Sequence, residues 1–349
     1  MSEKTKVLIV DDSAFMVKAV NEILHSDDDL EVVGTARNGK ECLAMIRDLN
    51  PDVITLDVDM PVMDGLRAVR HIMIESPVPI IMLSSLSTHG DITFEALRLG
   101  VVDFLPKPSG AISRDIYDVR SQIINRVKIA TSVSMENIKR VKLPLRDEMP
   151  GLSERYGFHS LDYVVAIGTS LGGPNTIIRL MSHLPPTLPA SVVAAQEISP
   201  KILPAFAKKF AEHSAWRVEV AEPGKELEQG VCYVSSIQEP VMVGRDADGK
   251  PCIINAEKKN QPLNELFTSA SRVFSQNSIG ILLTGIGDDG SEGFEEIRAN
   301  SGVTVAQSTN TCVYPNLTKC AIERGLADYI VDDRTLPKRI SNIFDQKVH

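Results

Sequence analysis

A chain of 349 residues, 43% of them apolar, is longer than one typical domain and can bury two hydrophobic cores. Its formal net charge of −9 argues against the clustered Lys and Arg surface by which proteins hold nucleic acid or an anionic membrane. The five cysteines show no C-x-x-C spacing, so neither a disulfide framework nor a zinc site is indicated.

The N-terminus, MSEKTKVLIVDDS, has an apolar run too short for a signal peptide. No stretch reaches the roughly 18 apolar residues that a membrane helix needs. We therefore expect a soluble, cytoplasmic protein that is not inserted in a membrane.

The first part of the chain alternates short apolar runs with amphipathic segments of helix length. The runs KVLIV, EVVGT, DVITL, PIIML and VVDFL are rich in β-branched residues, and each precedes such a segment. Helices are predicted over 14–25, 39–48, 65–75, 91–99 and about 112–130. Strands that each lead into a helix are typical of a doubly wound parallel sheet, so residues 1–130 are predicted to form one α/β domain.

Residues 131–158 combine prolines and basic residues with little periodicity, which is typical of a linker. A second alternation follows, with the strand LDYVVAIG and a helix from about residue 173, then ASVVAAQ and a helix from about residue 201. The stretch 216–255 is rich in strands and punctuated by Gly and Pro, which indicates β-hairpins.

The chain closes with a helix over 263–275, the strand IGILLTG, a helix over 291–299 and the strand GVTVAQ. Residues 159–346 are therefore predicted to form a second α/β domain, with a largely parallel sheet and inserted β-hairpins.

Acidic and polar residues follow the predicted strands of the first domain. Asp11 and Asp12 come after the first strand, and Asp57 ends the third. Ser84 ends the fourth strand and Lys107 follows the fifth. The carboxyl ends of parallel strands meet at one crevice, so these side chains are expected to converge. Carboxylates gathered there call for a hard cation such as Mg²⁺, and a lysine beside a hydroxyl suits the oxygens of a transferred phosphoryl group.

The motifs VDDS, LDVDMPVMDG, MLSS and DFLPKP make this domain resemble the receiver domain of response regulators, a five-stranded flavodoxin-like fold. The resemblance implies that Asp57 is the phosphoacceptor and that a histidine kinase is the phosphodonor. The implied Mg²⁺ ligands are Asp11, Asp12 and Asp57, with the backbone carbonyl of Asp59. The implied switch residues are Ser84, Phe104 and Lys107, of which Lys107 also contacts the phosphoryl group.

In the second domain, Ser170 lies in the stretch AIGTSLGGP, at a bend between a strand and a helix. The letters G-T-S-L-G match the G-x-S-x-G motif, in which a serine nucleophile is exposed on a sharp strand-to-helix turn. Glycines permit the tight backbone, and the helix N-terminus offers N–H donors to a developing oxyanion. The same serine could instead be an ordinary helix cap, because so short a pattern often arises by chance.

The loop LLTGIGDDGSEGF has its glycines in the G-x-G-x-x-G spacing of dinucleotide-binding loops. Asp288 and Asp289 would place negative charge where a pyrophosphate must lie. The next strand ends in Gln307 instead of the acid that holds a ribose, so a nicotinamide or flavin site is disfavoured. A carboxylate at this sheet edge suits the acid of a catalytic triad.

The stretches AIGTSLGGP, LLTGIGDDG, NELFTSA and LPASVVAAQ make this domain resemble the catalytic domain of the chemotaxis methylesterase family. Together with the receiver-like domain, the resemblance covers nearly the entire chain. It implies hydrolysis of glutamate methyl esters on methylated chemoreceptors, and often deamidation of receptor glutamines, by a Ser-His-Asp triad that an unphosphorylated receiver blocks. The implied nucleophile is Ser170 and the implied triad acid is Asp289, with no cofactor in this domain.

The family's general base is the histidine of a Q-H-M-P sequence, and the matching stretch here is QEISP, with Glu197 in that place. A glutamate with an ordinary pKa of about 4.3 accepts a serine proton poorly at neutral pH. Two nearby carboxylates can share a proton, so a Ser-Glu-Asp hydrolase is expected to work best at acidic pH. His159, His183 and His213 are expected at the surface of the second domain, away from the base position.

These features predict a phosphorylation-regulated hydrolase of two-component chemotaxis signalling. The alternative is a binding protein, a methylesterase homologue without turnover whose receiver still switches its docking on a signalling partner. A DNA-binding regulator is disfavoured by the negative charge and by an α/β second domain in place of a helix-turn-helix.

Overall fold

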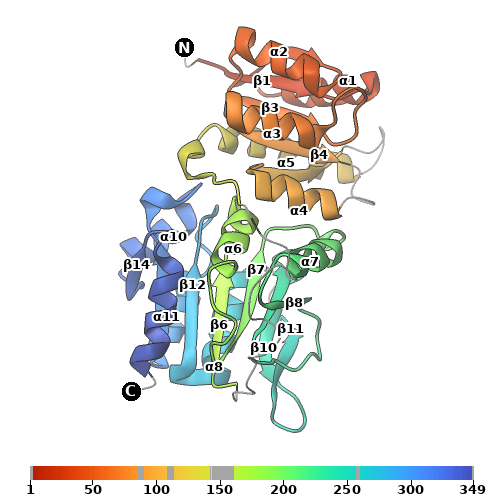
Figure 1. The fold of residues 1–349 in the computed structure, drawn as a ribbon. Coiled ribbons are helices and arrows are strands. Elements are labelled where there is room, and N and C mark those ends of the chain that lie inside the picture. Colours follow the sequence, from red (N-terminus) through yellow and green to blue (C-terminus); the bar gives the residue numbers. More distant parts are fainter. Residues whose placement is uncertain are drawn as a thin grey trace. The chain divides into compact units, whose positions relative to one another are not determined.

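The computed structural model divides the chain into two compact units, residues 1–140 and 141–349. It describes residues 3–84, 90–107, 114–141, 143, 161–256 and 260–347, so much of the expected linker at 131–158 lies outside the described residues. Each unit is an α/β fold (Figure 1). In the described ranges, no helix is both long enough and apolar enough to cross a membrane.

The first unit is a five-stranded parallel sheet with helices on both faces, as predicted. Its strand order is β2-β1-β3-β4-β5, the order of a doubly wound sheet. The strands are β1 (Thr5–Val10), β2 (Leu30–Ala36), β3 (Val53–Asp57), β4 (Ile80–Ser84) and β5 (Asp103–Pro106). The helices are α1 (Ala14–Leu24), α2 (Gly39–Leu49), α3 (Gly65–Glu75), α4 (Gly90–Leu99) and α5 (Arg114–Ala130), followed by the short 3₁₀ turn η1 (Met135–Asn137).

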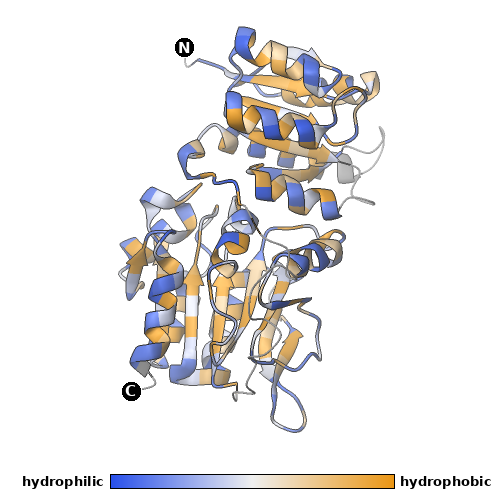
Figure 2. Ribbon diagram, in the orientation of Figure 1, coloured by the Kyte–Doolittle hydropathy of each residue, from blue (hydrophilic) through white to orange (hydrophobic). Residues whose placement is uncertain are grey.

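Both faces of this sheet are buried, which explains why its strands are continuous apolar runs in the sequence. Leu8 and Val10 of β1 pack with α2, α3 and α4, whereas Val7 and Ile9 pack with α1 and α5 on the opposite face. Figure 2 shows the strands as mainly hydrophobic and the outer faces of the helices as mainly hydrophilic.

The second unit is built on a seven-stranded, fully parallel sheet in the order β14-β13-β12-β6-β7-β9-β8. Its strands are β6 (Tyr163–Gly168), β7 (Ala190–Gln196), β8 (Arg217–Val220), β9 (Val231–Ser236), β12 (Ser278–Leu282), β13 (Val303–Gln307) and β14 (Tyr329–Val331). Strands β10 (Val241–Arg245) and β11 (Pro251–Asn255) form a separate antiparallel hairpin.

The helices of this unit are α6 (Gly173–Met181), α7 (Leu203–Glu212), α8 (Pro262–Phe274), α9 (Ser291–Ala299), α10 (Asn316–Glu323) and α11 (Leu336–Lys347). Short 3₁₀ turns are η3 (Ser275–Asn277) and η4 (Thr309–Thr311). One large core lies between the sheet, the hairpin and helices α8, α9 and α10. Helices α6, α7 and α11 lie in front of the sheet in Figure 1.

The stretch 216–255 contains one hairpin, where the sequence indicated several. Strands β8 and β9 instead join the parallel sheet. The loop between them runs back to the amino end of β9, where the Gly230 N–H donates to the carbonyl of Ala190 at 3.0 Å. Side-chain donors also hold this loop, because the Gln229 amide binds the carbonyls of Pro186 and Leu188. The pattern of apolar residues is the same for a strand in a hairpin and a strand in a parallel sheet, so it could not distinguish them.

Candidate functional site

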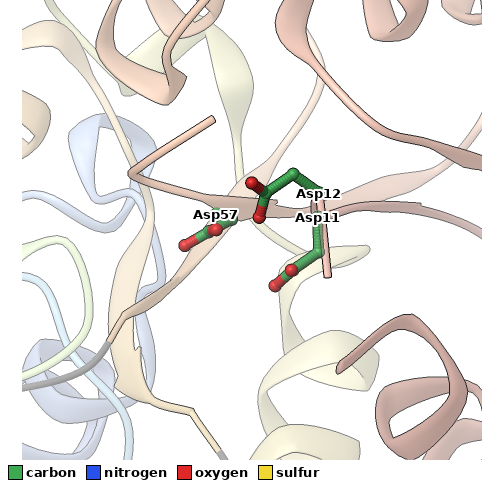
Figure 3. A group of neighbouring side chains, drawn as sticks. All are labelled: Asp11, Asp12 and Asp57. Carbon is green, nitrogen blue, oxygen red and sulfur yellow. The ribbon is translucent and has the colours of Figure 1, made fainter. Parts of the chain in front are cut away.

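The three aspartates that the sequence singled out in the first unit lie together. Figure 3 shows Asp11 and Asp12 beside Asp57, at the carboxyl ends of β1 and β3. Each side chain can offer an oxygen that lies within 4.8 Å of the other two. Asp11 and Asp57 are buried and Asp12 is exposed. Carboxylate oxygens with solvent access on one side are the donor set that Mg²⁺ prefers, so these residues fit that ion.

Lys107 joins two of these carboxylates. Its Nζ lies 2.8 Å from an oxygen of Asp11 and 2.8 Å from an oxygen of Asp57. Burial lowers the pKa of Lys107, but the hydrogen bonds to both carboxylates outweigh burial and leave that pKa above its ordinary value. Burial raises the pKa of Asp57, and the hydrogen bond from Lys107 opposes this rise. The lysine therefore supplies the positive charge that buried carboxylates need.

Backbone contacts fix the position of Asp57. Its Oδ1 accepts a hydrogen bond of 2.7 Å from the Val58 N–H. A Cβ at Gly65 would lie 2.2 Å from the Asp57 carbonyl oxygen, so only glycine allows α3 to approach this closely. The two expected switch residues lie on neighbouring strands. Ser84 is buried at the end of β4, and its carbonyl accepts a hydrogen bond of 2.8 Å from the Lys107 N–H. Phe104, on β5, is half-buried.

In the second unit, Ser170 lies on the turn between β6 and α6 that the G-x-S-x-G motif requires. The Ile286 N–H donates to its Oγ at 2.7 Å, and the hydroxyl donates back to the Ile286 carbonyl at 3.3 Å. The Ser170 N–H also donates to the Thr284 carbonyl at 3.3 Å. Ser170 is therefore held against the loop that follows β12, which is the same loop that carries Asp289.

Two glycines make this turn possible. Gly172 precedes α6 with a φ of +73°, a left-handed conformation that favours glycine. A Cβ at Gly285 would lie 2.5 Å from the Ser170 Oγ and 2.8 Å from its backbone nitrogen. The G-x-G spacing of this loop thus allows its backbone to lie against a serine.

Glu197 directly follows β7 and is half-buried. Strand β9 fixes the loop around it, because the Ser236 hydroxyl donates to the Ile198 carbonyl at 2.6 Å and the Ile237 N–H donates to the Gln196 carbonyl at 3.0 Å. Strand β7 is the neighbour of β6, so Glu197 and Ser170 end adjacent strands. Among the described residues, the Ser170 hydroxyl hydrogen-bonds only to Ile286, so it makes no hydrogen bond to Glu197 in this structure.

The carboxylate of Asp289 caps helix α8. Its oxygens accept hydrogen bonds from the N–H groups of Leu263 at 2.7 Å and Asn264 at 3.0 Å. Burial raises the pKa of Asp289, and the backbone donors oppose this only in part. The loop that contacts Ser170 therefore also carries Asp289. The hydrogen bonds of the Asp289 carboxylate, however, come from the first residues of α8.

A residue to which no sequence motif assigned a role, Asn264, makes the matching cap on the neighbouring helix. The Asn264 Oδ1 accepts from the N–H groups of Gly290 at 2.9 Å and Gly293 at 2.8 Å, at the start of α9. Helices α8 and α9 therefore cap each other, and the NELFTSA and GDDG motifs form one structural unit. The available signal was that Asn264 is a polar residue in the first turn of a helix that begins with Pro262. Its partners, Gly290 and Gly293, lie 26 and 29 residues further along the chain.

Gln307, at the position where a dinucleotide-binding fold has its ribose-binding acid, makes hydrogen bonds within the protein. Its Oε1 accepts from the Thr284 N–H at 3.0 Å, and its Nε2 donates to the Thr311 carbonyl at 2.8 Å. This buried amide joins the end of β13 to the loop that positions Ser170. The side chain at the ribose-binding position therefore has a structural role.

None of the histidines that the structure describes in this unit is shown to bond Ser170. His183 is exposed, as expected. His213 is buried at the end of α7, so the expectation that it lies at the surface is wrong. It follows the last turn of a helix whose Phe206 and Phe210 are buried, and no local pattern around His213 indicates that the chain turns inward there. His159 lies outside the described residues.

Gln196 is a further feature that the sequence did not reveal. It is fully buried at the end of β7, next to Glu197, and its amide oxygen and nitrogen have no hydrogen-bond partner in the part of the chain that the structure describes. Such unmet hydrogen-bonding capacity is uncommon in folded proteins.

Each of the two units matches a known protein family. Residues 7–113 match the family described as response regulator receiver domain, and residues 165–340 match the family described as CheB methylesterase. A protein-glutamate methylesterase/protein-glutamine glutaminase of Caldanaerobacter subterraneus subsp. tengcongensis is 36% identical, covering 100% of this chain and 98% of the relative. One of the same description from Pyrococcus horikoshii is 37% identical, covering 97% and 94%.

Among solved structures, the CheB methylesterase catalytic domain of Thermotoga maritima is 27% identical, covers 52% of this chain and 98% of its own, and has a TM-score of 0.49. The two family matches occupy the two units in the order receiver, then methylesterase, and the two relatives align over 98% and 94% of their own length. The chain therefore belongs to the CheB methylesterase family, with a response regulator receiver domain preceding the methylesterase domain.

Proposed function

We propose that this chain hydrolyses glutamate γ-methyl esters on chemoreceptors, with Ser170 as the nucleophile and phosphorylation of Asp57 as the switch. The hydrogen bond from the Ile286 N–H to the Ser170 Oγ carries the proposal. It orients the hydroxyl at a strand-to-helix turn and stabilises negative charge on that oxygen as its proton leaves. Deamidation of receptor glutamines would use the same groups and release ammonia.

In the proposed reaction, the Ser170 Oγ attacks the ester carbonyl carbon while its proton passes to a base. The tetrahedral intermediate then expels methoxide, which takes the proton and leaves as methanol, and an acyl-serine is left. Water attacks the acyl-serine, gives its proton to the same base, and restores the free hydroxyl as the glutamate carboxylate departs. We propose that N–H groups of the turn between Ser170 and α6 bind the oxyanion, because at the start of α6 the Gly173 N–H already donates to the Ser170 carbonyl and Pro174 has no N–H.

We propose Glu197 as the base, because it directly follows β7, the strand adjacent to that of Ser170, and because the resemblance of QEISP to Q-H-M-P implies the family's histidine position for it. A carboxylate is a weaker base than imidazole, and the Ile286 N–H lowers the demand on it by stabilising the alkoxide. Asp289 is proposed as the acid of the triad. Burial raises its pKa, which suits a carboxylate that shares a proton with a neighbour.

In the receiver, Asp57 is the proposed phosphoacceptor and a histidine kinase the proposed donor. Asp11, Asp12 and Asp57 would hold Mg²⁺, which supplies positive charge to the oxygens of the phosphoryl group. Lys107 lies on two of these carboxylates and would move its contact to the new phosphoryl oxygens. Ser84, at the end of β4, and Phe104, on β5, would then change conformation in response to the phosphoryl group. We propose that the protein acts in the cytoplasm.

Methanol release from methylated chemoreceptor, measured from about pH 5 to about pH 8 with phosphorylated protein, tests the proposal. The parent should release methanol, most rapidly at the acidic end, and Ser170→Ala should not. Glu197→Gln should lose activity at every pH, whereas Glu197→His should move the optimum toward neutral pH. Release by the parent no greater than by Ser170→Ala at any pH would leave the phospho-switched binding protein as the better account.

A further inference from the structure

A pocket opens at the carboxyl edge of the second unit's sheet, on the side of the Glu197 loop away from Ser170. It has a volume of about 620 Å³. Its walls come from the start of α7, the ends of β8 and β9, and the hairpin. They are largely apolar and rich in proline, and include Pro200, Leu203, Ala221, Pro240 and Val241.

The pocket has a buried polar group that lacks a partner. Ser235 lines it and is 2% exposed, and the Ser235 hydroxyl has no hydrogen-bond partner among the residues that the structure describes. Its neighbour Ser236, which also lines the pocket, already donates to the Ile198 carbonyl. A buried hydroxyl without a partner is unfavourable, so a ligand that supplies one gains affinity there.

The charge at the mouth of the pocket is negative. Glu222 and Glu239 line it and are exposed, and no lysine or arginine is among its lining residues. Glu222 lies 3.3 Å from the ammonium group of Lys225. Glu239 makes no ion pair within the described ranges, so its charge is available to a cationic ligand. Apolar walls below a carboxylate suit a side chain with an aliphatic stem and a positive head.

The strand order gives the distance between this pocket and the candidate catalytic residues. In the strand order β12-β6-β7-β9-β8, Asp289 follows β12, Ser170 follows β6, Glu197 follows β7, and Ser235 lies on β9. Two strand spacings, about 10 Å, separate β6 from β9. That span corresponds to about three residues of an extended polypeptide, or about seven residues of a helix.

We propose that this pocket binds a segment of the substrate polypeptide that carries a lysine or arginine close to the modified glutamate. The stem of the basic side chain packs on the proline-rich wall, and its head pairs with Glu239. A backbone amide group of the same segment pairs with the Ser235 hydroxyl. The inference rests on the proposed hydrolysis at Ser170 and adds to it a basis for choosing among substrate glutamates.

The test uses phosphorylated full-length protein and synthetic peptides with one glutamate methyl ester. A single lysine is moved from two to eight residues away on either side, and norleucine at the same position is the uncharged match. The parent should hydrolyse the lysine peptide with a kcat/KM about threefold higher at one favoured spacing, the size expected of a solvent-exposed ion pair. Glu239→Gln should abolish this preference. Asp248→Asn, an equal charge change at the hairpin turn, should retain it.

Ser235→Ala should lower kcat/KM about fivefold for lysine and norleucine peptides alike, without lowering the melting temperature, because the lost hydroxyl has no partner in the free protein. Binding of the same peptides to Ser170→Ala, followed by fluorescence anisotropy, separates this inference from the hydrolysis. Lysine-dependent binding without hydrolysis by the parent would refute the proposed reaction and leave the pocket's role standing. Equal binding of lysine and norleucine peptides at every spacing would overturn the inference.

Discussion

Gly285→Ala should remove hydrolase activity while leaving the chain folded. The added Cβ would lie 2.5 Å from the Ser170 Oγ and 2.8 Å from the Ser170 nitrogen. The hydroxyl could rotate away, but the nitrogen belongs to the backbone, so the turn itself must move. A third close contact, 3.0 Å to a methyl group of Leu317, opposes retreat of the loop on that side.

The size of the effect follows from these contacts. The closest one is about 1 Å shorter than ordinary van der Waals contact. Overpacking of this kind costs about 1–3 kcal/mol of stability, and misplacing a catalytic group by about 1 Å costs about 100-fold in rate. Gly287 is the matched control, since it has a φ of +94° and no atom within 4 Å of an added Cβ. Gly287→Ala should cost about 1–2 kcal/mol through backbone strain but should not displace Ser170.

Both variants are assayed for methanol release and for unfolding in denaturant. We expect similar losses of stability and a selective loss of kcat in Gly285→Ala. If Gly285→Ala releases methanol at the parent's rate, Ser170 is not the group that attacks the ester, or its position does not matter. If both variants lose activity in proportion to stability, the steric argument fails.

Three further variants test other parts of the structure. Asp57→Asn should abolish labelling by acetyl phosphate, as should removal of Mg²⁺ by a chelator, and labelling that persists would refute the receiver assignment. Asn264→Ala leaves two N–H groups of α9 uncapped, so its free energy of unfolding should fall by about 1–2 kcal/mol. Because burial raises the pKa of Asp289, stability is lost as the pH rises through the folded pKa. Asp289→Asn cannot ionise, so its stability relative to the parent should increase with pH in denaturant titrations.

Much of the receiver could be predicted because the order of strands and helices along the chain determines where its site residues lie. Apolar strands followed by helices imply a parallel sheet, and the carboxyl ends of such strands converge, so Asp11, Asp57 and Lys107 had to meet. The position of Ser170 on a strand-to-helix turn followed in the same way. These inferences need only the order of elements along the chain.

What could not be predicted depends on partners distant in sequence. The reciprocal caps of Asp289 and Asn264 join two helices whose contact no local pattern encodes. Strands β8 and β9 are parallel because the loop between them crosses back, which apolar periodicity does not record. Strand β14 has only three residues and α10 only eight, too short for a clear pattern. Helix α11 does carry buried apolar residues at helical spacing, Leu336, Ile340, Ile343 and Phe344, so that element was predictable and was overlooked. Local signals predict elements, and packing decides how the elements pair.

The most direct test of the central claim is methanol release from methylated chemoreceptor by the full-length protein, measured with and without acetyl phosphate. We expect acetyl phosphate to raise the rate of the parent and to leave the rate of Asp57→Asn unchanged, and we expect no methanol from Ser170→Ala. Equal release by the parent and Ser170→Ala, with or without the phosphodonor, would contradict it.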